Sequence, residues 1–149
     1  MWTRETAVAI DQFSAKVTNE LPEISRLADR IDVFCHERNI HGRVAYRFNL
    51  VLDEVLTNII SYGFPKGGRH EIEVKVVYDG RSLTASISDD GAAFDPLSQA
   101  APDIHAGIEG RKIGGLGIHL LRKLTDLADY RRADGRNHLT FRMRTDATS

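Results

Sequence analysis

The stretch EIEVKVVYDGRSLTASISDDG, residues 71–91, predicts the centre of the fold. Apolar residues alternate with polar ones from residue 71 to 76, and they alternate again from 82 to 88. Strict alternation indicates strands with one buried face. Asp79-Gly80 stands between the two runs, and this dipeptide is a strong signal for a two-residue hairpin turn. The stretch is therefore predicted to be an antiparallel hairpin that buries one of its faces.

The sequence before this hairpin predicts one strand and two helices. Apolar residues recur every three or four positions over residues 21–34 and again over 44–59, so each segment has one apolar helix face. Residues 39–42 indicate a break between the helices, and Gly63 is a good stop for the second one. An imperfect alternation of apolar residues near positions 8–13 predicts a short first strand.

The sequence after the hairpin predicts a binding loop, a helix and a second hairpin. Residues 89–117 lose all periodicity, and long connections of this kind are usually lids or binding loops. The spacing of Ile118, Leu121, Leu124 and Ala128 predicts a third helix, and residues 130–143 predict a closing hairpin. Helices on one face of such a sheet make an α+β two-layer α/β sandwich, with a mixed, mainly antiparallel sheet.

Length and composition suit one domain over residues 1–149. The apolar fraction of 42% and the charged fraction of 28% are ordinary for a soluble globular protein. A net charge of −1 gives no field that favours nucleic acid or an anionic membrane, so neither is expected as a partner. No apolar run approaches a membrane span, and residues 1–10 do not resemble a secretory signal. Cys35 is the single cysteine and is predicted to be a buried thiol, so we expect a cytoplasmic protein.

Two polar clusters lie where the apolar pattern does not demand them. Glu54 and Asn58 are four residues apart on the second helix, so their side chains are neighbours on one face. An amide oxygen there could bind Mg²⁺ and a carboxylate could accept a proton, although a solvated helix face would look the same. Asp89 and Gly91 follow a strand, where a carboxylate can accept an exocyclic amine and glycine admits a flat ligand. A polar turn would also use these residues.

A third cluster, Gly114-Gly115-Leu116-Gly117, begins the third helix. Backbone N–H groups at a helix start favour phosphate, and Lys112 adds positive charge just before it. A flexible hinge would be the structural alternative. Other nucleotide and metal motifs are missing: the sequence has no P-loop, no Rossmann fingerprint and no H-E-x-x-H zinc signature.

The order of the three clusters resembles the GHKL ATPases, the superfamily that includes gyrase and the histidine kinases. The pair Glu54 and Asn58 resembles their N box, Asp89-x-Gly91 resembles the G1 box, and the glycines before residue 118 resemble the G2 box. Phe94-Asp95-Pro96 and the motif at residues 137–140 are similar to those of the anti-sigma-factor serine/threonine-protein kinases. In one departure, Ala93 stands where many relatives have a second glycine in G1.

This resemblance implies a Bergerat ATP-binding fold with ATP and Mg²⁺ as its ligands. It implies that Glu54 is the general base, that Asn58 holds Mg²⁺, and that Asp89 accepts the adenine amine above Gly91. The phosphates would be bound by residues of the G2 region, and Thr140 would touch the adenine through water. The residues of that G2 region are Lys112, Gly114, Gly115 and Gly117.

Three functions are consistent with these features. In the first, the chain is an anti-sigma factor and protein serine/threonine kinase that phosphorylates an anti-anti-sigma partner with a STAS domain and holds a sigma factor, as a homodimer. In the second, ATP is a structural ligand and the chain sequesters a partner without kinase activity. The third, a detached histidine kinase ATPase half, ranks last because too few residues precede Glu54 for a phospho-acceptor hairpin.

Overall fold

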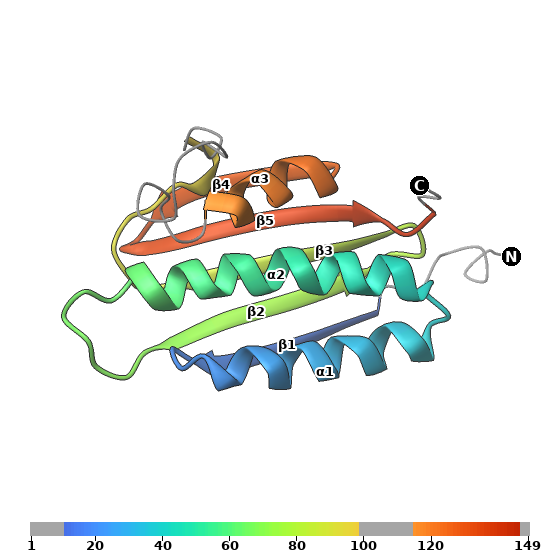
Figure 1. Cartoon of the computed structure of the whole chain (residues 1–149), viewed down its shortest axis with the longest axis horizontal. Coiled ribbons are helices and arrows are strands. Elements are labelled where there is room, and N and C mark those ends of the chain that lie inside the picture. Colours follow the sequence, from blue (N-terminus) through green and yellow to red (C-terminus); the bar gives the residue numbers. More distant parts are fainter. Residues whose placement is uncertain (1–10, 99–114, 147–149) are drawn as a thin grey trace, which may run out of the picture.

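A single antiparallel sheet forms one layer of the molecule (Figure 1). The computed structural model describes residues 11–98 and 115–146. Within them the strand order is β1-β2-β3-β5-β4, so the predicted central hairpin β2–β3 lies in the middle of the sheet. The strands are β1 (Asp11–Thr18), β2 (Glu71–Tyr78), β3 (Ser82–Asp89), β4 (Leu127–Ala133) and β5 (Arg136–Arg144).

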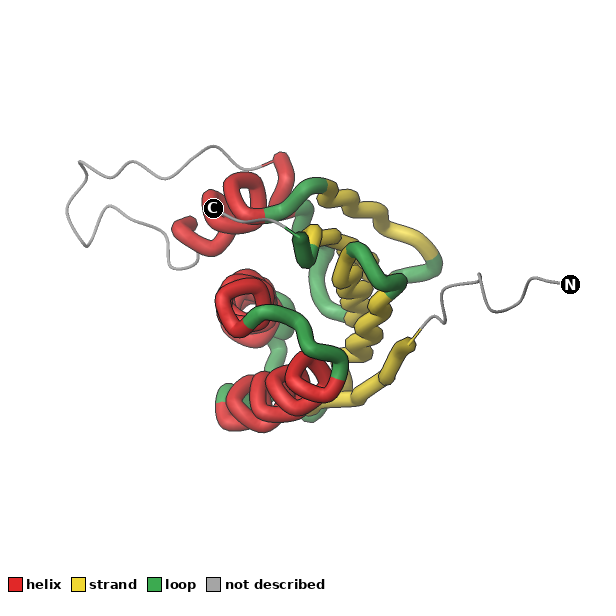
Figure 2. Tube along the Cα trace, turned by 90° about the vertical axis from the view of Figure 1, so that its right-hand side faces the viewer, coloured by secondary structure: helices red, strands yellow, loops and turns green. Residues whose placement is uncertain are grey.

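The helices form the second layer, on one face of the sheet only (Figure 2). They are α1 (Pro22–Glu37), α2 (Gly42–Tyr62) and α3 (Gly115–Leu124), with the short 3-10 helix η2 (Pro96–Ser98). The predicted α+β two-layer sandwich is confirmed. All four strand pairings among the described residues are antiparallel, so the parallel component of a mixed sheet is not found there. The reason is that α1 and α2 carry the chain back and forth between β1 and β2, and an even number of crossings makes β2 antiparallel to β1.

The core lies between the two layers because strands and helices each present one apolar face. Every second residue of β2 is buried from Ile72 to Val76, as the alternation predicts. The stripe of α2 that includes Phe48, Val51 and Leu52 is buried against it, and Phe48 packs on Phe141 of β5 with ring centroids 5.2 Å apart. This central packing holds α2 over the sheet, and α2 provides one wall of the site described below.

The predicted break between the first two helices is confirmed at residues 39–42. Asn39 has a positive φ of 58°, a conformation that commonly ends helices, and the next amide, Ile40 N–H, donates to the Cys35 carbonyl at 3.0 Å. The second helix then starts at Gly42 and is capped by His41, whose Nδ1 accepts a hydrogen bond from the backbone N–H of Arg43 at 3.0 Å. Local capping therefore sets the register of α2.

The third helix is shorter than the sequence predicts. It ends at Leu124, and Ala128 belongs to β4 rather than to the helix. The chain already pairs with β5 at Asp126, whose N–H donates to the Arg142 carbonyl at 2.8 Å and whose carboxylate accepts from the Arg144 N–H at 2.7 Å. An apolar residue four positions after Leu124 suits a helix or a strand equally well, and pairing with β5 decided between them.

Two further expectations concern the cysteine and the membrane. Cys35 is buried, as predicted, and burial raises the pKa of its thiol to about 11, so at neutral pH it is a small apolar side chain. None of the helices in the described ranges is long and apolar enough to cross a membrane.

Candidate functional site

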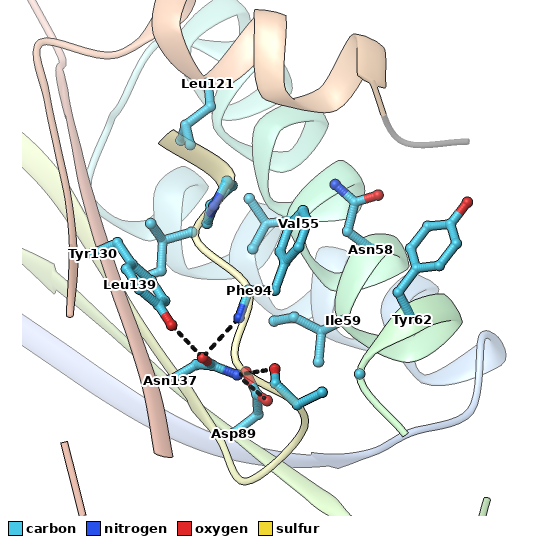
Figure 3. Close-up of a pocket in the computed structure, with 13 residues that line it drawn as sticks. Val55, Asn58, Ile59, Tyr62, Asp89, Phe94, Leu121, Tyr130, Asn137 and Leu139 are labelled. Carbon is cyan, nitrogen blue, oxygen red and sulfur yellow. Dashed lines mark hydrogen bonds between the residues drawn. The ribbon is translucent and has the colours of Figure 1, made fainter. Parts of the chain in front are cut away.

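A pocket opens between the helical layer and the end of the sheet where β3 finishes (Figure 3). Its walls come from the C-terminal half of α2, from α3, from the segment after β3, and from β4 and β5. Most of the lining is apolar, with a few polar side chains among it, which is the usual character of a small-molecule site. The lining residues are Val55, Asn58, Ile59, Tyr62, Gly63, Asp89, Ala92, Phe94, Pro96, Leu121, Tyr130, Asn137 and Leu139.

Asp89 is the buried acidic residue of this pocket. It is the last residue of β3 and only 2% exposed, because its side chain lies on the face of the sheet that the helices cover. Its Oδ1 accepts two hydrogen bonds, from the Gly91 N–H at 2.8 Å and from Asn137 Nδ2 at 3.0 Å. Within the described ranges no hydrogen bond reaches Oδ2. One carboxylate oxygen is therefore held by the protein, and the other is left as an acceptor for a ligand.

The turn after Asp89 lies directly against the end of α2. The Ala92 N–H donates to the Gly63 carbonyl at 2.7 Å. A Cβ on Gly91 would stand 2.6 Å from that carbonyl oxygen and 2.9 Å from Asp89 Oδ1, both closer than real contacts. Arg132 of β4 donates to the Gly91 carbonyl from the other side at 2.7 Å. Glycine is required at position 91 because the backbone after β3 lies against the backbone at the end of α2. This steric constraint is stricter than the need to admit a flat ligand.

The N-box residues of α2 are placed differently from one another. Asn58 is 6% exposed and lines the pocket. Glu54, one turn earlier, is half-buried and is not part of the lining. Burial, and secondly the negative charge of Asp53, raise the pKa of the Glu54 carboxyl above its ordinary value. Glu54 makes no hydrogen bond or ion pair with any other described residue.

The residues at this site fit a nucleotide better than a metal held by protein alone. The described residues contain no group of three or more His, Cys, Asp or Glu side chains placed to hold a metal ion. Asn58 offers an amide oxygen, and Mg²⁺ commonly takes one or two protein ligands with the rest from phosphates and water. The donor set is therefore compatible with Mg²⁺ that arrives with a nucleotide.

The other predicted site residues divide into three groups. Lys112 and Gly114 lie outside the described residues. Gly115 and Gly117 belong to the first turn of α3, which begins above the C-terminal half of α2 (Figure 1). Thr140 is a correction: it lies on the face of β5 away from the helices, because its neighbour Leu139 is buried and lines the pocket.

The lining residues that sequence reasoning did not select include Asn137, Tyr130 and Phe94, and the last two both hydrogen-bond to Asn137. In the sequence, Asn137 stands out only as part of the motif at residues 137–140. A stronger signal was present, since the buried positions of β5 alternate as Asn137, Leu139, Phe141 and Met143. An amide in register with three apolar core residues indicates a buried polar group that needs partners.

A family model described as "Histidine kinase-like ATPase domain" matches residues 17–143. The chain is also 34% identical over 100 residues to the serine/threonine-protein kinase BtrW of Bordetella bronchiseptica. The aligned region covers 67% of this chain and 70% of that protein.

Solved structures give the same fold at low sequence identity. The histidine kinase domain from the blue-light activated histidine kinase of Erythrobacter litoralis aligns over 84% of this chain with a TM-score of 0.51, and the longer protein aligns over 83% with a TM-score of 0.55. Both are 17% identical, so this likeness concerns the fold alone. The chain spans 60% and 41% of those two structures.

Proposed function

Because the chain belongs to the histidine kinase-like ATPase domains, we propose that it is an ATP-dependent protein serine/threonine kinase. The observation that carries the proposal is the state of Glu54. It is a half-buried carboxylate with a raised pKa and with no hydrogen bond or ion pair inside the described part of the chain. A protein that only held ATP would have no need to keep such a base one helical turn from a pocket-lining amide. The 34% identical relative is named as a kinase of this class.

At the base end of the pocket, Asp89 selects the nucleotide. Its Oδ2 accepts the exocyclic amine of adenine, and the apolar walls from α2 and β5 cover the ring faces. Gly91 packs closely against the backbone at the end of α2, and this contact fixes the position of the turn after Asp89 relative to that helix. Gly115 and Gly117, with Lys112 and Gly114 ahead of them, bind the phosphates through backbone N–H groups and positive charge.

At the phosphate end, Glu54 activates the attacking hydroxyl. The substrate hydroxyl loses its proton to the Glu54 carboxylate while its oxygen forms a bond to the γ-phosphorus, and the bond from that phosphorus to the bridging oxygen breaks to release ADP. Asn58 would hold Mg²⁺ through its amide oxygen, and the ion would supply positive charge to neutralise the phosphates. The raised pKa suits this role because a stronger base accepts the proton more readily.

The protein substrate we propose is an anti-anti-sigma partner with a STAS domain, and the second partner is a sigma factor. In this scheme the chain is one domain over residues 1–149, works in the cytoplasm as a homodimer, and regulates transcription by holding the sigma factor when its other partner is phosphorylated. The motif at residues 94–96 after Asp89 and the similarity to BtrW support this branch of the family.

The competing function is an ATP-binding module that sequesters a partner without kinase activity. Transfer of labelled phosphate from ATP to STAS-domain proteins of the same organism separates the two. Labelled serine or threonine on one of those proteins supports the kinase. ATP binding without transfer to any cognate STAS protein supports the module.

ATP binding itself is tested by thermal melting. Mg-ATP at about a hundredfold above Kd should stabilise the fold by about 2.7 kcal/mol. In a chain of this size that raises the melting temperature by about 2–4 °C for each kcal/mol. A melting curve that saturating Mg-ATP does not move would contradict both functions.

A further inference from the structure

Asn137 uses the full hydrogen-bonding capacity of its side-chain amide inside the core. It is 7% exposed and lies on β5, beside the end of β3. Its Nδ2 donates to Asp89 Oδ1 at 3.0 Å and to the Ala92 carbonyl at 2.9 Å. Its Oδ1 accepts from the Tyr130 hydroxyl at 2.6 Å and from the Phe94 N–H at 3.3 Å. Figure 3 shows the four bonds converging on this one side chain.

These four partners determine which way the amide points. An amide group has two N–H donors and one oxygen with two lone pairs, and all of them are used. In the reversed orientation the oxygen would face the Asp89 carboxylate and the Ala92 carbonyl, which are both acceptors. The amide nitrogen would then face the Phe94 N–H, another donor. Only the observed orientation pairs every donor with an acceptor.

The orientation of the amide in turn determines the orientation of Asp89. Oδ1 receives Asn137 Nδ2 and the Gly91 N–H, so it is turned toward the protein. Oδ2 is left toward the pocket, where an acceptor-only oxygen can receive a donor from a ligand. The arrangement joins β3, β4 and β5 to the segment after Asp89, so a purine that enters meets a carboxylate that is already placed.

We infer that Asn137 is a positioning residue for base selection: by holding Asp89 Oδ1, it aims Asp89 Oδ2 at the exocyclic amine of the purine. The inference rests on the proposed ATP site. The alternative is a structural latch, in which Asn137 ties the loop to the sheet and has no part in the choice of base. The two roles predict different effects of replacing Asn137. Loss of a latch lowers the affinity for all purine nucleotides equally, whereas loss of a positioning residue lowers the affinity only for those that carry the exocyclic amine.

The test compares ATP with purine riboside 5′-triphosphate, which has hydrogen in place of the exocyclic amine. Dissociation constants for both are measured by calorimetry on the full chain. The parent should bind ATP about ten- to a hundredfold more tightly, the value of a hydrogen bond to a charged group. In Asn137→Leu this preference should fall to within about threefold. An unchanged preference, with both affinities lowered equally, would overturn the inference in favour of the latch.

Two milder variants keep the test decisive if Asn137→Leu does not fold. Asn137→Asp keeps the shape but turns acceptors toward Asp89 Oδ1 and the Ala92 carbonyl, and two carboxylates this close cannot both ionise, so the preference for ATP should collapse. Tyr130→Phe removes one of the four hydrogen bonds, so the preference should fall by only a few-fold. Full preference in both variants would also overturn the inference.

The matched control is His138→Gln. His138 is the next residue on β5 and lies on the face away from the helices, so its replacement should leave the preference for ATP unchanged. Failure of the inference differs from failure of the proposed function. If the parent binds neither nucleotide, the ATP site itself is wrong. If the parent prefers ATP and the Asn137 variants keep that preference, the positioning role alone is wrong.

Discussion

The two ends of the proposed nucleotide site, Asp89 inside the pocket and Glu54 just outside its lining, surround their carboxylates in opposite ways. At the base end, Asp89 is 2% exposed, and one of its oxygens is fixed by two donors from the protein. At the other end, Glu54 is half-buried and has no such donors among the described residues. Burial, and secondly the negative charge of Asp53, raise the pKa of Glu54.

This difference separates recognition from catalysis. A carboxylate that distinguishes between similar bases works best when its side chain is already fixed in the free protein. Binding then carries no entropy cost for ordering that side chain. A general base must instead keep its proton affinity, and hydrogen bonds to its charged form would lower that affinity. The same functional group, a carboxylate, therefore suits the two proposed roles because its surroundings differ.

The largest expected effect is on the catalytic end. Glu54→Gln keeps the shape of the side chain and removes the proton acceptor, so the rate of phosphotransfer should fall by about 10²–10⁴. ATP affinity should stay within about twofold of the parent. The measurement is transfer of labelled phosphate to the STAS-domain partner, with binding followed separately. Equal transfer by parent and variant would remove Glu54 from the mechanism.

Stability and a matched variant check that this loss is chemical. A carboxyl with a raised folded pKa contributes stability at low pH that is lost as the pH rises through that value. At pH 7 Glu54→Gln should therefore be no less stable than the parent by thermal melting. Glu71→Gln, on an exposed position at the start of β2, should transfer phosphate at the parent rate.

The next effect is on the recognition end. In Asp89→Asn the amide oxygen can take the place of Oδ1 between its two donors, which turns the new NH₂ group toward the pocket. Two donors would then face each other when adenine binds, so ATP affinity should fall by about 1–3 kcal/mol. Inosine triphosphate carries an acceptor at that position, so its affinity relative to that of ATP should be higher in this variant than in the parent. The measurement is competition between the two nucleotides.

A neighbouring carboxylate serves as the control for this change. Asp90 is half exposed and its Oδ1 lies 3.2 Å from His70 Nδ1, outside the pocket lining. Asp90→Asn should leave the ATP-to-inosine ratio as in the parent. If Asp89→Asn also leaves it unchanged, Asp89 is a turn residue and the base end of the pocket lies elsewhere.

A smaller effect is expected where the base end meets α2. The methyl group of Gly91→Ala would stand 2.6 Å from the Gly63 carbonyl oxygen, so the turn must shift and the hydrogen bond from Ala92 should weaken. Overpacking of this kind costs about 1–3 kcal/mol. The melting temperature should fall accordingly. Gly42→Ala is the control, because its Cβ meets nothing within 4 Å and should be neutral or stabilising.

The smallest effect concerns the charge beside Glu54 and the pH dependence of phosphotransfer. The proposed general base is active when ionised, so phosphotransfer should decline as the pH falls through the pKa of Glu54, which is raised above its ordinary value. Asp53→Asn removes the secondary cause of the raised pKa, so this decline should move to lower pH. A decline that stays in place would show that burial alone sets the pKa.

The two Asp-Gly turns show how far local sequence reasoning reached. In the closing hairpin predicted over residues 130–143, Asp134-Gly135 forms a two-residue turn, with positive φ values of 55° and 73° as such a turn requires. Asp79-Gly80 was predicted to be the same, yet the strands it joins end at Tyr78 and resume at Ser82. The Asp79 carboxylate accepts the N–H groups of Arg81 and Ser82, both at 2.8 Å, which favours a longer turn. The hairpin was predictable, but the side-chain bond that set its length was not.

The site was predictable in part for a similar reason. Asp89 and Asn58 were found because each breaks an apolar pattern beside other polar residues, and the structure brings both to one pocket. Thr140 was chosen on the wrong face of β5, since a shift of one position in a strand moves a side chain across the sheet. Asn137 is 48 residues from Asp89, and no local pattern relates them.

The sequence alone determined which elements form and in which order, apart from the end of the third helix, because periodicity and capping act over a few neighbouring residues. It also determined which residue types could carry the chemistry. Only the tertiary structure decided which oxygen of Asp89 is held, which face of β5 lines the pocket and which carboxylate of α2 stays without partners. Those properties depend on strands and helices far apart in the chain meeting at fixed distances, and contacts of that kind form only when the whole sheet has assembled.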